Sequence, residues 1–223
     1  MTQRSTLFQS KGSRLFVVGL VLLLASFPLF SEPKSVLLFS GSSRNGSFNM
    51  ELIHEAAHIA KQDKARVQIL DLKKIGIPHY DADVESTKGM PKGAQELREA
   101  MINSEIIVIS TPEYNASFSG LLKDAIDWAS RAPSGDPSRQ AFKGKTFVLL
   151  SASPSSGGGK RAVNNLKAVV QEIGGTVCHE TFSLPKAYDA FDADGHLKDA
   201  KQEQELQHLI QNALNNQCNP TQK

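Results

Sequence analysis

Short apolar runs alternate with helix-patterned segments from residue 35 to residue 216, and this alternation constrains the fold more than any other feature. Ile106-Ile107-Val108-Ile109 is apolar at every position, which indicates a strand buried on both faces. Strands separated by helices predict a parallel sheet with helices on both sides. We therefore expect an α/β three-layer sandwich whose five parallel strands are residues 35–40, 66–72, 105–110, 145–151 and 176–183.

Helical periodicity connects these strands, and the remaining segments are predicted as loops. Residues 73–92 and 131–143 are rich in Gly, Pro or Ser and are expected to lack regular structure. Ligands of such sheets bind beyond the carboxyl ends of the strands, near the point where the strand order reverses. The candidate loops are therefore 41–49, 111–117 and 152–159, and helices are expected at 47–62, 94–103, 118–130, 160–173 and 197–216.

Composition excludes several classes of protein. The 223 residues are 40% apolar and 22% charged, which favours one folded domain over a disordered chain, collagen or a disulfide scaffold. Cys178 and Cys218 have neither zinc-ligand nor CxxC spacing. No stripe of Lys and Arg with interleaved aromatic residues is present, so the sequence does not predict a nucleic-acid-binding protein.

The N-terminal segment differs from the rest of the chain. Residues 1–34 carry a local charge of +3, and the remaining residues sum to −1. Residues 15–30 are almost wholly apolar and follow three basic residues, which is the layout of a secretory signal or an N-terminal anchor. The alternative is an over-long gene model, in which these residues are never made. We expect residues 1–33 to lie outside the fold, 34–216 to form the domain and 217–223 to form a tail.

The first candidate loop has the composition of an anion site. It follows the first strand and opens the first helix, where backbone N–H groups favour a phosphate. Ser42 and Ser47 add hydroxyl groups, Arg44 a guanidinium and Asn49 an amide. The loop matches neither a dinucleotide GxGxxG nor a Walker sequence, which favours a monophosphate. The alternative is an ordinary strand–helix turn built from small residues.

The other two loops are less specific. In the second loop Pro112 stiffens the backbone, Tyr114 offers an aromatic face, and Asn115 offers a donor and an acceptor, as a planar heterocycle needs. The third loop contains Ser153 and three glycines, at which backbone can approach a ligand closely. Taken alone, the second loop is better interpreted as a surface turn and the third as a flexible connector.

Together the loops resemble the NADPH-dependent FMN reductase family, a flavodoxin-like group that includes bacterial quinone and chromate reductases. Its signature GSxRxxSxN is met between Gly41 and Asn49, and PEYN followed by GxLKxAIDW is met between Pro112 and Trp128. The resemblance covers about residues 35–215. It implies a flavodoxin-like sandwich that binds FMN.

The resemblance also implies roles for individual residues. Ser42, Arg44, Ser47 and Asn49 would hold the FMN phosphate. The isoalloxazine would lie against Pro112, Glu113, Tyr114 and Asn115, with Ser153 and Gly158 at its other edge. No catalytic side chain is expected, because the flavin itself carries the hydride chemistry.

The implied reaction transfers a hydride from NADPH or NADH through the flavin N5 to a small acceptor. Quinones are the expected acceptors, and azo compounds, chromate or free flavin are alternatives. Family members assemble as homodimers or homotetramers and are cytoplasmic, whereas the N-terminal segment suggests export or membrane association through residues 15–30. The leading alternative function is a flavodoxin-type electron shuttle, which the near-neutral body disfavours, and a third is a flavin-free scaffold.

Residues 54–58 match the HExxH pattern of zinc proteases. That pattern also needs a third ligand and a cleft. A helical wheel places Ile53 and Ala57 on the core side and His54, Glu55 and His58 on the polar side. We therefore interpret the match as a solvated helix face and expect no metal.

Overall fold

The computed structural model describes residue 1, residues 32–133 and residues 135–218. Every helix and strand below belongs to a unit that begins at Pro33. The predicted N-terminal segment at 15–30 and residues 219–223 of the predicted tail lie outside the described residues. Among the described residues, no helix combines the length and the apolar character that a membrane span requires.

The elements follow the predicted alternation of strand and helix. The strands are β1 (Ser35–Ser40), β2 (Arg66–Leu70), β3 (Ile106–Ser110), β4 (Thr146–Ala152), β5 (Thr176–Val177) and β6 (Phe182–Leu184). The helices are α1 (Phe48–Gln62), α2 (Leu72–Ile75), α3 (Ala82–Lys88), α4 (Lys92–Ile102), α5 (Gly120–Ala129), α6 (Lys160–Glu172) and α7 (Ala200–Leu214), with a 3-10 turn η1 (Ala187–Asp189).

The sheet is parallel throughout, with strand order β2-β1-β3-β4-β5. This is the flavodoxin-like order, and its switch point lies between β1 and β3. The predicted fifth strand at 176–183 is wrong as one element. It is interrupted after Val177, so that β5 pairs with the start of β4 and β6 pairs with the end of β4.

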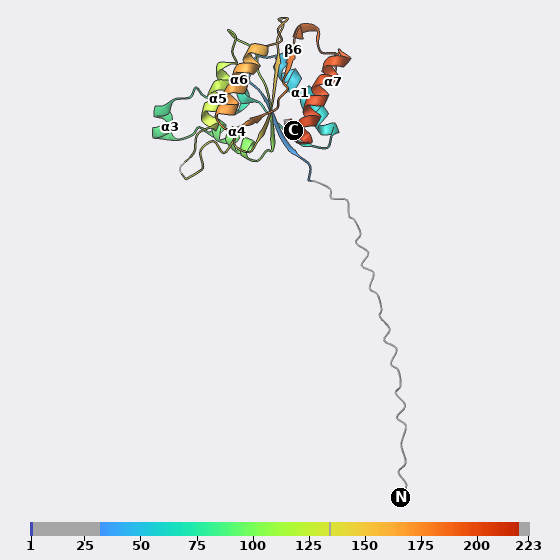
Figure 1. Ribbon diagram of the computed structural model, residues 1–223. Helices are drawn as coiled ribbons and strands as arrows, with labels where there is room; N and C mark the ends of the chain where they lie inside the picture. The colour runs from blue at the N-terminus through green and yellow to red at the C-terminus, as the bar shows by residue number, and fades with distance from the viewer. Residues whose placement is uncertain (2–31, 134, 219–223) are drawn as a thin grey trace. The chain divides into compact units, whose positions relative to one another are not determined.

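Alternation along each strand builds a separate core on each face of the sheet. In β1, Leu38 packs in the core beneath α1 and α7, and Leu37 packs in the core beneath α4, α5 and α6. Val108 and Ile107 of β3 divide in the same way. Figure 1 shows α4, α5 and α6 on one side of the sheet, with α1 and α7 on the other. The result is the expected three-layer sandwich.

The prediction of one long loop at 73–92 is wrong. The segment contains most of α2, all of α3 and the start of α4. Asp71 and Asp81 begin the two short helices, because each side chain accepts two backbone N–H groups of the first turn. Helix α3 buries no residue, so apolar periodicity could not reveal it.

A disulfide joins Cys178, just after β5, to Cys218, beyond α7. The 40-residue separation hid this pairing in the sequence. The backbone supports the same contact, since His179 N–H donates to the Cys218 carbonyl at 2.9 Å. The end of the described chain is thereby attached to the edge of the sheet.

Candidate functional site

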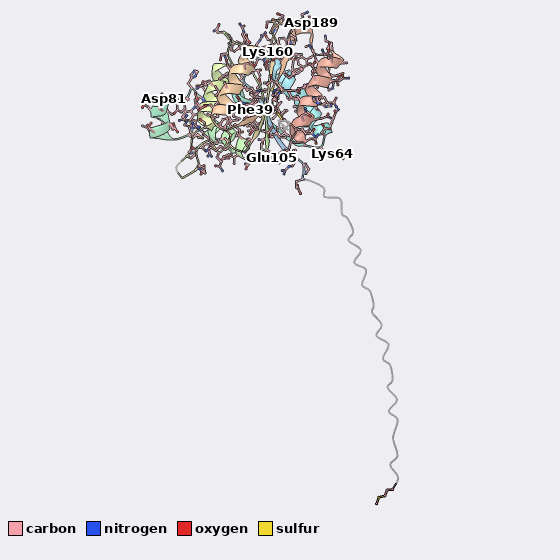
Figure 2. All side chains as sticks on the ribbon, in the orientation of Figure 1. Phe39, Lys64, Asp81, Glu105, Lys160 and Asp189 are labelled. Atoms are coloured by element: carbon pink, nitrogen blue, oxygen red, sulfur yellow. A yellow bond between two sulfur atoms is a disulfide. The ribbon has the colours of Figure 1, made fainter. Side chains whose placement is uncertain are left out.

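Three loops meet at the carboxyl edge of the sheet, on either side of the switch point. The Gly41 N–H donates to the Ser110 carbonyl at 2.8 Å, which joins the ends of β1 and β3. Figure 2 shows Lys160 and Asp189 at this end of the sheet, with Glu105 and Lys64 at the other. We call residues 41–47 the first loop, 111–119 the second loop and 153–159 the third loop.

The first loop ends in the capped start of α1. Ser47 Oγ accepts from Met50 N–H at 3.4 Å, and Ser42 Oγ accepts from Arg44 N–H at 3.3 Å. Gly46 has φ +62°, so the chain turns there in a conformation that favours glycine. Other N–H groups in the first turn of α1 have no partner within the helix, and the Arg44 side chain is exposed beside them. Such donors with a guanidinium suit a phosphate.

Asn49 is buried, and its carboxamide is engaged within the protein. Its Oδ1 accepts from Ser110 Oγ at 2.8 Å and from Ala152 N–H at 2.9 Å. Its Nδ2 donates to the Ala152 carbonyl at 2.9 Å. Asn49 therefore ties α1 to the carboxyl ends of β3 and β4. The structure places this predicted phosphate ligand as a brace beneath the first loop.

The second loop presents Tyr114 on a tight turn. Tyr114 and Ser117 exchange two backbone hydrogen bonds, at 2.9 and 3.0 Å. Asn115 and Ala116 between them have φ of +51° and +65°, the signs required by a two-residue I′ turn. Tyr114 is 54% exposed, whereas Pro112 is buried at the base of the loop. The turn thus holds an aromatic ring open to a ligand.

Glu113 of the second loop is directed at α6. Its Oε1 accepts from Arg161 Nε at 2.8 Å, and its Oε2 accepts from Arg161 N–H at 3.1 Å and Ala162 N–H at 3.4 Å. Helix α6 has no side-chain cap of its own, so Glu113 supplies one. The Arg161 guanidinium, assisted by these N–H groups, holds the pKa of the Glu113 carboxyl below its ordinary value. The carboxylate clamps the second loop to the start of α6.

The third loop is folded against β6. Ser153 Oγ accepts from Ser155 N–H at 3.2 Å, and the Gly158 carbonyl accepts from Ser151 Oγ at 2.7 Å. A Cβ at Gly158 would lie 2.9 Å from the Ser183 backbone, and the φ of Gly158 is +62°. Gly158 is therefore required by the fold of the loop itself. Ser153 is half-buried and Gly158 is buried, both on the loop beside β4.

The donor set fits FMN. The first loop gathers hydroxyl, guanidinium and helix N-terminal N–H groups, which suit one phosphate. Tyr114 and Asn115 are exposed on the second loop, where an aromatic face and an amide suit a planar heterocycle. Asn49 and Glu113, whose polar groups contact protein, hold the loops in place. Nine of the ten predicted residues thus lie on the three loops, and the tenth, Asn49, lies in the first turn of α1.

The interpretation of 54–58 as a solvated helix face is wrong for Glu55. His54 and His58 are exposed, but Glu55 is 3% exposed and its Oε2 lies 2.8 Å from His196 Nδ1. A turn at Asp192, whose carboxylate accepts from His196 N–H, brings this distant histidine onto α1. The hydrogen bond to Glu55 raises the pKa of His196. Among the described residues, no group of three His, Cys, Asp or Glu side chains is arranged to hold a metal ion.

Sequence reasoning missed Arg161, which lies 48 residues from its partner Glu113. No local pattern marks it, because any arginine near the start of α6 looks like a solvent-exposed charge. It also missed Ser110, whose hydroxyl holds Asn49. A buried strand that ends in a serine was the only signal available.

Comparisons with known proteins identify the family of the chain. Residues 35–189 match the family described as NADPH-dependent FMN reductase. An NAD(P)H-dependent FMN reductase of Pseudomonas aeruginosa is 34% identical over 182 residues, covering 81% of this chain and 94% of its own. A quinone reductase of Escherichia coli K12 is 37% identical over 141 residues, covering 63% of this chain and 71% of its own.

A solved structure is similar in both sequence and fold. The flavoenzyme NAD(P)H:acceptor oxidoreductase FerB of Paracoccus denitrificans has a TM-score of 0.65 and 30% identity. The match covers 82% of this chain and 96% of that chain.

Proposed function

Because the chain belongs to the NADPH-dependent FMN reductase family, we propose that its three loops bind FMN and that it passes electrons from NADPH or NADH to a small acceptor. A quinone is the acceptor class that we propose, since a quinone reductase is among the similar proteins. The exposed rim around Tyr114 supports this choice, because a planar acceptor can reach it from solvent.

FMN, when bound, supplies the carrier that takes a hydride from the nicotinamide and releases electrons to the acceptor. The chain supplies binding and orientation. Ser42, Ser47 and Arg44 hold the phosphate, and Tyr114 and Asn115 orient the ring system. Ser153 and Gly158 lie at the opposite edge of the ring system. No side chain of the site is required to gain or lose a proton.

The observation that carries the proposal is the bracing of the loops by polar contacts within the protein, which are buried at Asn49 and partly exposed at Glu113. Asn49 fixes the start of α1 to β3 and β4, and Glu113 fixes the second loop to α6. Bracing of this kind holds a binding site ready before the ligand arrives, which reduces the entropy lost on binding. A simple surface turn would not need it.

Absorption spectroscopy tests the proposal. Purified protein should show bound flavin, lose the oxidised flavin absorption on adding NADPH under anaerobic conditions, and regain it on adding a water-soluble quinone. A protein that binds FMN but oxidises neither NADPH nor NADH would instead be an electron shuttle. A colourless protein that takes up no FMN would be a scaffold, and either result would contradict the proposal.

We also propose that the protein is a homodimer or homotetramer in which α5 contributes to the interface. The family resemblance supports this, as does the position of α5 directly after the exposed turn at Tyr114. Light scattering after size-exclusion chromatography should give the mass of two or four chains. A monomer with full quinone reductase activity would contradict this proposal.

For localisation, we propose that residues 1–33 target the domain to an oxidising compartment. The basic and apolar pattern supports this, and so does the Cys178–Cys218 disulfide, because cytoplasmic thiols are kept reduced. Thiol trapping in fractionated cells should find the pair oxidised outside the cytoplasm. Free thiols in an intact cytoplasmic chain would contradict it.

A further inference from the structure

A cavity of about 260 Å³ lies beside the first loop. It is lined by residues 42–47, by the first two turns of α1, and by Asp71 and Lys73 at the start of α2. The start of α2 is outside both sequence signatures of the family. It brings Lys73 to the first loop, where Lys73 Nζ donates to Asn45 Oδ1 at 3.1 Å.

Some charged groups around this cavity are exposed to an incoming anion, and others already have partners in the protein. Arg44 and Lys73 are exposed cations at its edge. The Asp71 carboxylate is already engaged, because it accepts from the N–H groups of Lys73 and Lys74 and lies 3.6 Å from Lys74 Nζ. Glu51, in the first turn of α1, is the opposing acid. A dianion at the loop would gain from the two cations and lose from Glu51 and, more weakly, from the engaged Asp71.

We infer that Lys73 is a phosphate-binding residue, which with Arg44 recognises a phosphate monoester at the first loop. The inference rests on the proposed function and extends it to a residue outside the family signatures. Hydrogen bonding to Asn45 holds the Lys73 ammonium at the loop, so that it requires little reordering when the anion arrives. Two ligands of the reaction carry such a group, namely the 5′-phosphate of FMN and the 2′-phosphate of NADPH.

Binding measurements on the full chain test the inference. Flavin-free protein is titrated with FMN and with riboflavin, which lacks the phosphate. Lys73→Gln should raise the Kd for FMN about three- to tenfold at low salt, and the increase should shrink at high salt because the ammonium is exposed. The Kd for riboflavin should not change. The comparison of the two flavins separates loss of a phosphate contact from damage to the loop.

Two matched variants sharpen the test. Lys88→Gln removes an exposed lysine at the end of α3, which does not line the cavity, and should leave the Kd for FMN unchanged. Glu51→Gln removes the opposing acid and should tighten FMN binding, again with no effect on riboflavin. Opposite signs from Lys73→Gln and Glu51→Gln are expected only from an electrostatic contribution to phosphate binding.

Steady-state kinetics with NADPH and NADH identify which ligand carries the phosphate. If the monoester is that of NADPH, Lys73→Gln should raise the KM for NADPH severalfold, with the KM for NADH and the Kd for FMN unchanged. Equal weakening of FMN and riboflavin, or no difference between Lys73→Gln and Lys88→Gln in any arm, would overturn the inference. A wild-type protein that binds neither flavin would contradict the proposed function and the inference together.

Discussion

Asn49 lies in a motif typical of phosphate binding, yet its side chain is buried and hydrogen-bonds within the protein. Its side chain satisfies the Ser110 hydroxyl together with the N–H and carbonyl of Ala152. Buried polar groups cost free energy when they lose such partners. Asn49 therefore stabilises the fold around the site, whatever it contributes to ligand binding.

Asn49→Ala should lower the free energy of unfolding by about 2–4 kcal/mol, because several buried polar groups lose their partners. Urea denaturation of the flavin-free protein measures this. Asn164→Ala, at an exposed position of α6, is the control and should change it by no more than about 0.5 kcal/mol. Weakened FMN binding without loss of stability would return Asn49 to the role of a ligand.

Tyr114, unlike Asn49, is exposed and is proposed to contact the flavin, and Tyr114→Ala tests that role. Because Tyr114 is 54% exposed, the unfolding free energy should fall by less than about 1 kcal/mol, whereas the flavin spectrum and quinone turnover should change. Gln204→Ala is the control, since Gln204 is exposed on α7 and lies outside the three loops. A large loss of stability would assign Tyr114 to the core.

At the scale of elements, Glu113 couples the second loop to α6. The low pKa of its carboxyl means that the contact stabilises the fold above the ordinary glutamate pKa and is lost as pH falls through the lowered value. Glu113→Gln should therefore cost about 1 kcal/mol near neutral pH, as for loss of a helix cap. The difference from wild type should disappear in acid.

Denaturation curves recorded between about pH 7 and pH 3 measure this difference. Asp127→Asn is the control, because Asp127 pairs with Lys123 on the surface of α5 and should contribute little. If the wild type kept its full stability advantage over Glu113→Gln at the acid end of this range, the Glu113 clamp would be contradicted.

The contact between Glu55 and His196 joins α1 to the turn before α7, and its pH dependence has the opposite sign. His196 has a raised pKa, so the charged pair stabilises the fold below the ordinary histidine pKa and is lost as pH rises through the raised value. Relative to His196→Gln, the wild-type melting temperature should be higher in mild acid. The difference should shrink toward alkaline pH.

Thermal melts from about pH 6 to pH 9 follow the change. Glu55→Gln should remove most of the pH dependence, because His196 then lacks its buried partner. A wild-type advantage that grows as pH rises would contradict the ion pair.

At the scale of the whole molecule, the disulfide attaches the chain beyond α7 to the edge of the sheet. Closing a loop with a sequence separation of 40 residues restricts the unfolded chain. Cys218→Ser should therefore lower the free energy of unfolding by about 2–4 kcal/mol. A reductant should destabilise the wild type and leave the variant unaffected. An equal response of both proteins would show that the wild-type thiols are free.

The architecture could be predicted because its determinants are local. Apolar runs such as Ile106–Ile109 and small-residue turns after them specify strands, helices and the edge at which loops gather. The ten site residues could be placed on these loops, but their contacts could not. Glu113 finds Arg161 48 residues away, and Glu55 finds His196 141 residues away. Such pairings depend on how the layers pack, which periodicity does not encode.

The central claim is that the three loops jointly bind a flavin with a single phosphate. A crystal structure of the protein with FMN tests it most directly. The account predicts the phosphate at residues 42–47, close to Arg44, and the ring system between Tyr114 and the third loop. Flavin bound elsewhere, or loops closed over one another with side chains filling the space between them, would contradict it.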